Sequence, residues 1–322
     1  MKTPATIREA LKAATAQLHS LPNANKDADL LLMRTPGKDR AWLLTHPDDP
    51  IAPEQLVTYE EKIARRARHE PIQYITGEQE FYGLTLRVTP AVLIPRPETE
   101  HLVETALARL PRNEPIRIAD IGTGSGAIAI ALAHGLPQAH ITALDISTAA
   151  LAVAKENAAR HSVQDRIDLR ESDLLAVVHG ELFDAIVSNP PYVSTNEELE
   201  PQVRDYEPAT ALYAGESGLD IYRRLIPQAA AALKPKGWLM MEIGHGQREA
   251  IAKLLNTWSD VSFVDDLQGI PRVAIARRQP DAILGADEVA WNDSDHPELQ
   301  KGSPKWVRKL RMEGEARIPK SW

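Results

Sequence analysis

The sequence has no cysteine, few aromatic residues and no excess of positive charge. The absence of cysteine excludes disulfides, thiolate metal sites and cysteine nucleophiles. The net charge of −8 argues against a surface that mainly reads phosphate backbones, so we expect no direct nucleic-acid partner. No apolar run approaches the roughly 18 residues that span a membrane, and no apolar signal segment follows Met1. We therefore expect a cytoplasmic protein without a membrane partner.

The composition that is present is typical of a globular chain, with 43% hydrophobic and 25% charged residues. A length of 322 residues predicts about two domains. Near the start, apolar side chains recur at helical spacing at Ile7, Leu11, Ala14 and Leu18. Further helices are predicted over residues 25–33, 38–44 and 53–69. Residues 1–80 are thus expected to form a small helical bundle.

Between residues 81 and 112 the hydrophobic period changes to that of a strand. Leu84, Leu86 and Val88 alternate with polar residues, which predicts a half-buried strand. Pro90 interrupts this pattern, and residues 91–94 form a second short extended run. Two adjacent extended runs predict a β-hairpin that links the bundle to the next domain.

Residues 113–280 alternate between strand-like and helix-like patterns. Strands are predicted over residues 116–121, 140–146, 166–170, 183–188, 237–243, 261–266 and 272–276. Helices are predicted over residues 127–134, 149–161, 218–233 and 247–258. This alternation predicts an α/β fold with a doubly wound, mostly parallel, seven-stranded Rossmann-like sheet. The last two strands are too close together for a right-handed crossover, so one of them is expected to be antiparallel.

Residues 281–322 differ from the rest of the chain. Their charge is acidic first and then basic, and they contain three of the six Trp residues. We interpret them as a C-terminal extension and assign them no role.

A glycine-rich loop follows the first strand of the predicted sheet and opens an Ala-rich helix. The residues at this turn are Asp120, Gly122, Thr123, Gly124, Ser125 and Gly126. Glycines there permit a positive φ and a close approach of the backbone to a ligand. The spacing resembles the first motif of S-adenosylmethionine-dependent methyltransferases, but Gly122, Gly124 and Ala127 also fit the dinucleotide pattern loosely. The loop alone therefore leaves both cofactors open, and a turn without a ligand is a third interpretation.

Two acidic residues end neighbouring strands of the predicted sheet. Asp145 ends the second strand, where a carboxylate can accept hydrogen bonds from both ribose hydroxyls of an adenosine cofactor. The alternative is that it caps the next helix, because Ser147 is nearby. Asp173 closes the third strand and either accepts the adenine amine or is simply solvated.

The fourth strand leads into Asn189, Pro190, Pro191 and Tyr192, which the sheet delivers to its carboxyl edge. Two prolines remove N–H donors and restrict the backbone to extended shapes. The Asn189 side-chain carbonyl and the Pro190 carbonyl can accept the two hydrogens of a planar NH₂ group, and Tyr192 can stack on its plane. We predict Asn189, Pro190 and Tyr192 as catalytic residues, with Pro191 also binding the substrate, and we predict no metal.

This Asn-Pro-Pro-Tyr segment resembles the signature of methyltransferases that act on amino groups of adenine, guanine or glutamine. Residues 71–83, 94–100 and 242–247 further resemble signatures of the PrmC/HemK family, the peptide chain release factor glutamine methyltransferases. The resemblance implies S-adenosylmethionine as cofactor and S-adenosylhomocysteine as product. The implied acceptor is the Gly-Gly-Gln glutamine of class I release factors. The resemblance also implies that the glycine loop, Asp145, Leu174 and Asn189 contact the cofactor.

Three other functions are open at this point: methylation of a nucleic-acid base (adenine N6 or guanine N2), a nicotinamide-dependent oxidoreductase, and a non-catalytic binding module. The acidic net charge disfavours the first, and the second leaves the Asn-Pro-Pro-Tyr segment without a role. Arg96, Glu98 and Glu100 either line a peptide channel or form ion pairs between the domains. We expect a monomer in which residues 1–80 recognise the release factor and residues 113–280 carry the chemistry.

Overall fold

The computed structural model describes residues 6–35 and 37–279, which form two compact units. The first unit contains the described residues up to 79, together with residues 88–90 and 199–206. The second contains the described parts of residues 80–87, 91–198 and 207–279. The predicted C-terminal extension, residues 281–322, lies outside the described residues.

The first unit is helical. Its helices are α1 (Ile7–Gln17), α2 (Ala24–Met33), α3 (Arg40–Thr45), α4 (Pro53–Ala67) and α5 (Ile72–Thr76). Thr6 and Glu9 form a capping box that starts α1, because each side chain accepts a hydrogen bond from the other residue's backbone N–H. The helices enclose an apolar core that includes Leu31, Tyr59 and Ile63. The bundle predicted from the apolar spacing is thus present.

A two-stranded hairpin, β1 (Glu78–Phe81) and β2 (Leu84–Arg87), follows the bundle. The predicted hairpin of residues 84–88 with residues 91–94 was wrong, because residues 91–94 are not a strand. The partner instead precedes β2, and the turn between them has a positive φ at both Tyr82 (51°) and Gly83 (72°). Such two-residue turns match the twist of a hairpin.

The second unit contains a seven-stranded sheet in the order β5-β4-β3-β6-β7-β9-β8. The strands are β3 (Arg117–Ile121), β4 (His140–Asp145), β5 (Ile167–Glu171), β6 (Phe183–Ser188), β7 (Leu233–Glu242), β8 (Ser259–Asp265) and β9 (Pro271–Arg277). The first five are parallel, and β9 runs antiparallel to both β7 and β8. The prediction of a mostly parallel, seven-stranded sheet with one antiparallel strand is confirmed.

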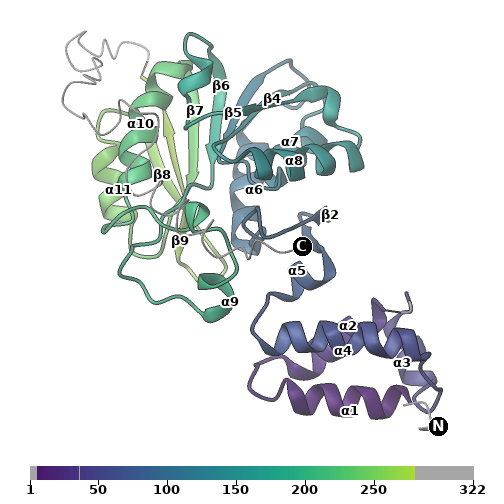
Figure 1. Cartoon of the computed structure of the whole chain (residues 1–322). Helices are drawn as coiled ribbons and strands as arrows, with labels where there is room; N and C mark the ends of the chain where they lie inside the picture. The colour runs from purple at the N-terminus through teal and green to yellow at the C-terminus, as the bar shows by residue number, and fades with distance from the viewer. Residues whose placement is uncertain (1–5, 36, 280–322) are drawn as a thin grey trace. The chain divides into compact units, whose positions relative to one another are not determined.

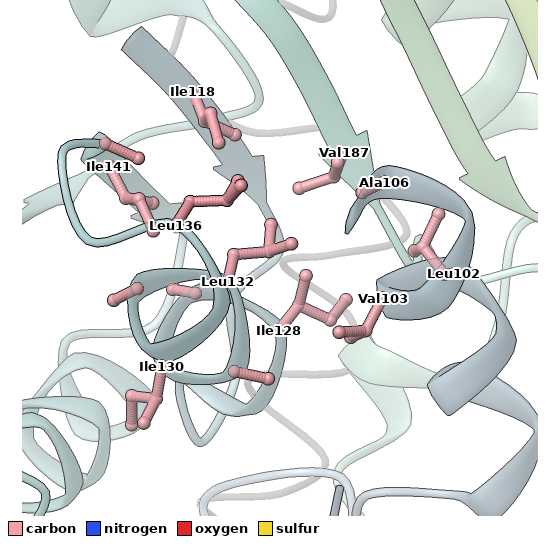
Figure 2. Close-up of a cluster of buried hydrophobic side chains, with 14 of the residues drawn as sticks. Leu102, Val103, Ala106, Ile118, Ile128, Ile130, Leu132, Leu136, Ile141 and Val187 are labelled. Atoms are coloured by element: carbon pink, nitrogen blue, oxygen red, sulfur yellow. The ribbon is translucent and has the colours of Figure 1, made fainter. Parts of the chain in front are cut away.

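Helices cover both faces of this sheet (Figure 1). They are α6 (Glu100–Arg109), α7 (Ala127–Gly135), α8 (Thr148–Arg160), α10 (Asp220–Ala232) and α11 (Arg248–Leu254). The short α9 (Pro201–Arg204) follows β6 in the chain but belongs to the first unit. Figure 2 shows Leu102 and Val103 of α6 gathered with Ile128 of α7 and Val187 of β6. The neighbouring Ile186 joins the core on the other face, with α10 and α11. This alternation follows from the two-residue period of a strand.

Among the described residues, the structure contains no helix that combines the length and apolar character needed to cross a membrane.

Candidate active site

The site begins where two parallel strands end side by side. Ile121 at the end of β3 pairs in register with Ser188 at the end of β6. The Ser188 hydroxyl donates a hydrogen bond of 2.8 Å to the Ile121 carbonyl. The chain continues from these strands into the glycine loop and into the Asn-Pro-Pro-Tyr segment. β3 lies between β4 and β6, and this reversal of strand order is where doubly wound sheets bind ligands.

The glycine loop is fastened to the end of β4. The backbone N–H groups of Gly122 and Thr123 both donate to the Leu144 carbonyl, and that of Gly124 donates to Asp145 Oδ2 at 2.8 Å. Positive φ angles at Gly122 (71°) and Gly124 (55°) bring these donors into place. These three N–H groups are therefore already used within the chain, unlike those that cradle a pyrophosphate.

Asp120 lies fully buried behind the loop. Its Oδ2 accepts hydrogen bonds from the Thr123 hydroxyl at 2.7 Å and from the Ala129 backbone N–H at 3.2 Å. Its Oδ1 has no hydrogen-bond partner among the described residues. Burial raises the pKa of Asp120 to about 7, because the charged carboxylate loses its hydration.

Asp145 braces two segments at once. Its Oδ1 accepts a hydrogen bond of 2.9 Å from the Ser147 backbone N–H, while Oδ2 holds Gly124. The cap of α8 is Ser147 itself, whose hydroxyl accepts from the Ala150 N–H at 3.2 Å. Burial raises the pKa of the Asp145 carboxyl, and backbone hydrogen bonds oppose this shift. The helix cap proposed as an alternative role for Asp145 thus belongs to its neighbour.

One cavity at this sheet edge brings many of the predicted site residues together. It is lined by Gly122, Gly124, Asp145, Asp173, Leu174, Asn189 and Pro191, among others. The other predicted residues, Asp120, Thr123, Ser125, Gly126, Pro190 and Tyr192, do not line it. The lining also includes Arg224 of α10, which sequence reasoning missed. Arg224 donates a hydrogen bond of 2.7 Å to Asp173 Oδ2, so this acid is ion-paired as well as partly exposed.

The Asn189 side chain has one end anchored. Its Nδ2 donates a hydrogen bond of 2.9 Å to the Thr99 hydroxyl. No described residue donates a hydrogen bond to its Oδ1, so this oxygen is free to accept one. Because the other end is fixed, the structure presents Asn189 as an acceptor at the cavity wall.

Behind the Asn-Pro-Pro-Tyr segment lies a buried carboxylate, Glu242, at the end of β7. Its Oε2 accepts a hydrogen bond of 2.6 Å from Thr99, and its Oε1 accepts one of 3.3 Å from the Tyr192 hydroxyl. Burial raises the pKa of Glu242 to about 7, and these two hydrogen bonds oppose the shift. No local sequence pattern predicts this contact, since Thr99 and Glu242 are 143 residues apart.

Gln247 fixes the backbone of the same segment. Its Nε2 donates to the Tyr192 carbonyl at 3.0 Å, and its Oε1 accepts from the Gly244 N–H at 2.9 Å. A Cβ on Gly244 would lie 3.0 Å from both Gln247 Oε1 and Tyr192 Cδ2. This close packing explains the glycine and the glutamine in residues 242–247, which had been noted only as part of a family signature.

Two of the three charged residues of the 94–100 stretch, Arg96 and Glu100, have partners within the second unit. Arg96 forms an ion pair of 2.6 Å with the buried Glu207. Glu100 accepts a hydrogen bond of 2.8 Å from the Tyr82 backbone N–H. Glu98 acts on Glu242 through its charge, which raises the pKa of that buried carboxyl. The contacts of Arg96 and Glu100 give these two residues structural roles within one unit.

Comparison with known proteins bears directly on this arrangement. Residues 9–77 match the family model described as the PrmC N-terminal domain, and residues 99–204 match the methyltransferase small domain. The release factor glutamine methyltransferase of Koribacter versatilis is 46% identical over 278 residues, covering 85% of this chain and 99% of that protein. Its counterpart in Geobacter sulfurreducens is 44% identical over 281 residues, covering 84% and 96%. Among solved structures, the T. thermophilus 16S rRNA N2 G1207 methyltransferase in complex with AdoMet and guanosine is 19% identical, covers 63% of this chain and 50% of that chain, and has a TM-score of 0.48.

The fold, the glycine loop and the matched domain define this protein as a methyltransferase with a Rossmann-like sheet. The oxidoreductase and the non-catalytic binding module are thereby set aside. Within this class, the chain belongs to the release factor glutamine methyltransferase family, because it shares 40–46% identity with several members over most of its length.

Proposed function

We propose that this chain transfers the methyl group of S-adenosylmethionine to the side-chain amide nitrogen of glutamine in the Gly-Gly-Gln motif of class I peptide chain release factors. The observation that carries the proposal is the position of Asn189. Its side-chain oxygen is free to accept a hydrogen bond, and Asn189 lines the same cavity as Gly122, Gly124 and Asp145. The related proteins are named release factor glutamine methyltransferases, which supports the same substrate class.

The cavity residues fit an adenosine cofactor that carries a positive charge and no pyrophosphate. The acids Asp145 and Asp173 lie at the ends of neighbouring strands, where they can accept hydrogen bonds from the ribose and the adenine amine. Leu174 supplies an apolar wall. Gly122 and Gly124 leave room for the backbone to approach the ligand. When bound, S-adenosylmethionine supplies a methyl group on a sulfonium and leaves as S-adenosylhomocysteine.

The Asn-Pro-Pro-Tyr segment performs orientation rather than acid–base chemistry. Asn189 Oδ1 and the Pro190 carbonyl accept the two hydrogens of the glutamine amide, and Tyr192 stacks on its plane. Holding both hydrogens directs the nitrogen lone pair toward the methyl group, and such positioning can supply much of a rate enhancement. The amide nitrogen would gain the methyl carbon as that carbon leaves sulfur, and would then release one of its two protons to solvent water. Pro191 keeps this stretch extended, because a proline ring fixes φ.

We assign recognition of the release factor to the helical bundle of residues 1–80, because the cavity residues lie in the second unit. The predicted linker of residues 81–112 does not stay separate, because residues 91–112 pack as part of the second unit, so we extend the methyltransferase domain to include them.

The direct test is mass spectrometry of the Gly-Gly-Gln peptide after incubation of purified release factor with this chain and S-adenosylmethionine. We expect one added methyl group on the glutamine, and no such product with the Asn189→Ala variant. Methylation of duplex DNA or ribosomal RNA, with an unmodified release factor, would refute the proposal.

A further inference from the structure

We propose that Glu242 is a positioning residue that acts through Thr99 to decide which end of the Asn189 amide faces the acceptor. This inference rests on the function proposed above, because it concerns the orientation of the group that holds the glutamine amide. It adds a residue, Glu242, that sets the orientation of the Asn189 amide from behind the proposed substrate-binding segment.

The three side chains form one continuous chain of hydrogen bonds. Asn189 Nδ2 donates to Thr99 Oγ1 at 2.9 Å, and Thr99 Oγ1 donates to Glu242 Oε2 at 2.6 Å. Glu242 is 1% exposed and Thr99 is 4% exposed, so water does not compete for these bonds. The residues come from three separate segments: the residue after β6, the short 3₁₀ helix η1 (Pro97–Thr99) and the end of β7.

The direction of this chain follows from what each group can donate. An ionised carboxylate only accepts hydrogen bonds, whereas a threonine hydroxyl has a single hydrogen to donate. Because that hydrogen points at Glu242, the remaining lone pairs of Thr99 can only accept. They therefore select the NH₂ end of the Asn189 amide, and the Oδ1 end is left to face the cavity. If the direction were reversed, Thr99 would donate to Oδ1, and Asn189 would present a donor where the substrate amide also has donors.

The second oxygen of Glu242 holds the other end of the same segment. Glu242 Oε1 accepts from the Tyr192 hydroxyl at 3.3 Å, so one carboxylate contacts the Tyr192 hydroxyl directly and the Asn189 amide through Thr99. The Tyr222 hydroxyl donates to the Glu242 backbone carbonyl at 2.7 Å, a contact that does not involve the carboxylate. Glu242 thus holds Tyr192 directly and Asn189 through Thr99, and these are the two side chains that the proposed reaction needs against the acceptor amide.

The ionisation state of Glu242 determines whether the hydrogen bonds run in one defined direction, from Asn189 through Thr99 to Glu242. Burial raises its pKa to about 7. The surrounding groups from every packed element are Thr99 and Glu98 on η1, Tyr192 after β6, Tyr222 on α10, and Arg272 on β9. Thr99, Tyr192 and the positive Arg272 favour the charged form, and Glu98 opposes it. A protonated carboxyl gains a hydrogen to donate, so Thr99 is no longer obliged to point at it.

The test compares single and double variants of the full chain in methyl transfer to release factor. We expect Glu242→Gln and Thr99→Val each to lower kcat by about tenfold or more, in the range seen when one preorganised hydrogen bond is lost. The dissociation constant of S-adenosylhomocysteine, measured by calorimetry, should stay within about threefold. Because the residues act in series, the kcat of the double variant should be no lower than that of the less active single variant. Thr99→Ser, which keeps the hydroxyl, should restore most of the rate.

The pH profile and one control separate positioning from a structural effect. The parental kcat should rise with pH through a midpoint near 7, and Glu242→Gln should give a flat profile at a low rate. Tyr222→Phe removes a hydrogen bond to the same strand residue outside the chain of bonds, so it should lower the melting temperature without changing this pH profile. Parental kcat in Glu242→Gln, or losses that multiply in the double variant, would overturn the proposal.

A separate readout distinguishes this inference from the proposed function. Carbon NMR of the labelled Glu242 carboxyl should show a higher pKa in Thr99→Val than in the parent, because the variant lacks a hydrogen bond to the ionised form. An unchanged pKa refutes the chain of bonds. A parental enzyme that leaves release factor unmethylated, with the expected pKa change present, refutes only the substrate assignment.

Discussion

A Cβ atom on Gly218 would lie only 2.3 Å from the backbone carbonyl oxygen of Tyr192. Gly218 also has a positive φ of 69°, which side chains rarely adopt. The Gln247 amide donates to the carbonyls of both residues, at 3.0 Å to Tyr192 and 3.3 Å to Gly218. The backbone of the Asn-Pro-Pro-Tyr segment therefore packs against the residues just before α10 with no space for one extra carbon.

The first prediction concerns this contact. Gly218→Ala should displace the Tyr192 carbonyl and lower the free energy of unfolding by about 1–3 kcal/mol, as overpacking does. It should also lower kcat, because the segment moves. Urea denaturation and methyl-transfer kinetics measure both effects. Gly246→Ala is the matched control, since Gly246 also has a positive φ, 77°, but open space around its Cβ position. Equal effects of the two variants on kcat would contradict the steric account.

The second prediction concerns Asn189. Asn189→Ala should leave S-adenosylhomocysteine affinity within about tenfold and lower kcat by about 10²–10³, the loss typical of removing a preorganised transition-state hydrogen bond. Tyr192→Phe should be much milder, because the ring can still stack. Radiolabelled methyl transfer at saturating cofactor measures kcat. More than a tenth of parental turnover in Asn189→Ala would contradict the orienting role.

The third prediction concerns Asp145. S-adenosylhomocysteine should raise the melting temperature of the parent, because a ligand that binds only the folded state stabilises it by mass action. Asp145→Ala should abolish most of this gain, since both the ribose acceptor and the brace on Gly124 are lost. Asp168→Ala, which removes an exposed acid on the neighbouring strand, is the control. A full thermal shift in Asp145→Ala would mean that the cofactor lies elsewhere.

The fourth prediction is a dependence of stability on pH. The pKa values of Asp120 and Glu242 are both raised to about 7 by burial, from ordinary values of 3.8 and 4.5. Between about pH 4.5 and 7, each group binds a proton in the folded chain but not in the unfolded chain. Their contribution to the free energy of unfolding therefore falls as pH rises through this window. Asp120→Asn and Glu242→Gln should each flatten the fall, measured by urea denaturation from pH 5 to 8, whereas Glu54→Gln, at an exposed site, should not.

The fifth prediction concerns the helical bundle. A variant that lacks residues 1–77 keeps the hairpin and the whole second sheet. It should bind S-adenosylhomocysteine with an affinity close to that of the parent, but methylate intact release factor far more slowly. Calorimetry and the mass-spectrometric assay measure the two properties. Undiminished methylation of intact release factor would assign substrate recognition to the second unit instead.

Local sequence patterns predicted the elements whose periodicity is strong. The strands β3, β4 and β6 are mostly apolar because both of their faces are buried, and the glycine loop follows directly from one of them. The helix α6 was missed because residues 81–112 were interpreted as a linker. Its apolar residues Leu102, Val103 and Ala106 have helical spacing, and this signal could have identified it.

The supporting residues of the site could not be predicted in the same way. Glu242 and Gln247 were seen only as parts of a signature, and Thr99 as part of another. Their roles depend on hydrogen bonds between segments far apart in the chain, which no local period encodes. Glu207 and Arg224 are similar, since each is defined by its partner, Arg96 or Asp173.

The hydrogen bonds that hold the glycine loop to β4 affect the thermodynamics of cofactor binding. The loop backbone is held by the Leu144 carbonyl and the Asp145 carboxylate through bonds made entirely within the chain. The loop is therefore already ordered before a ligand binds, and the binding free energy does not have to offset the conformational entropy lost in ordering it. The heat-capacity change of cofactor binding should then reflect only the apolar surface of the ligand and cavity, without the larger change that accompanies coupled folding.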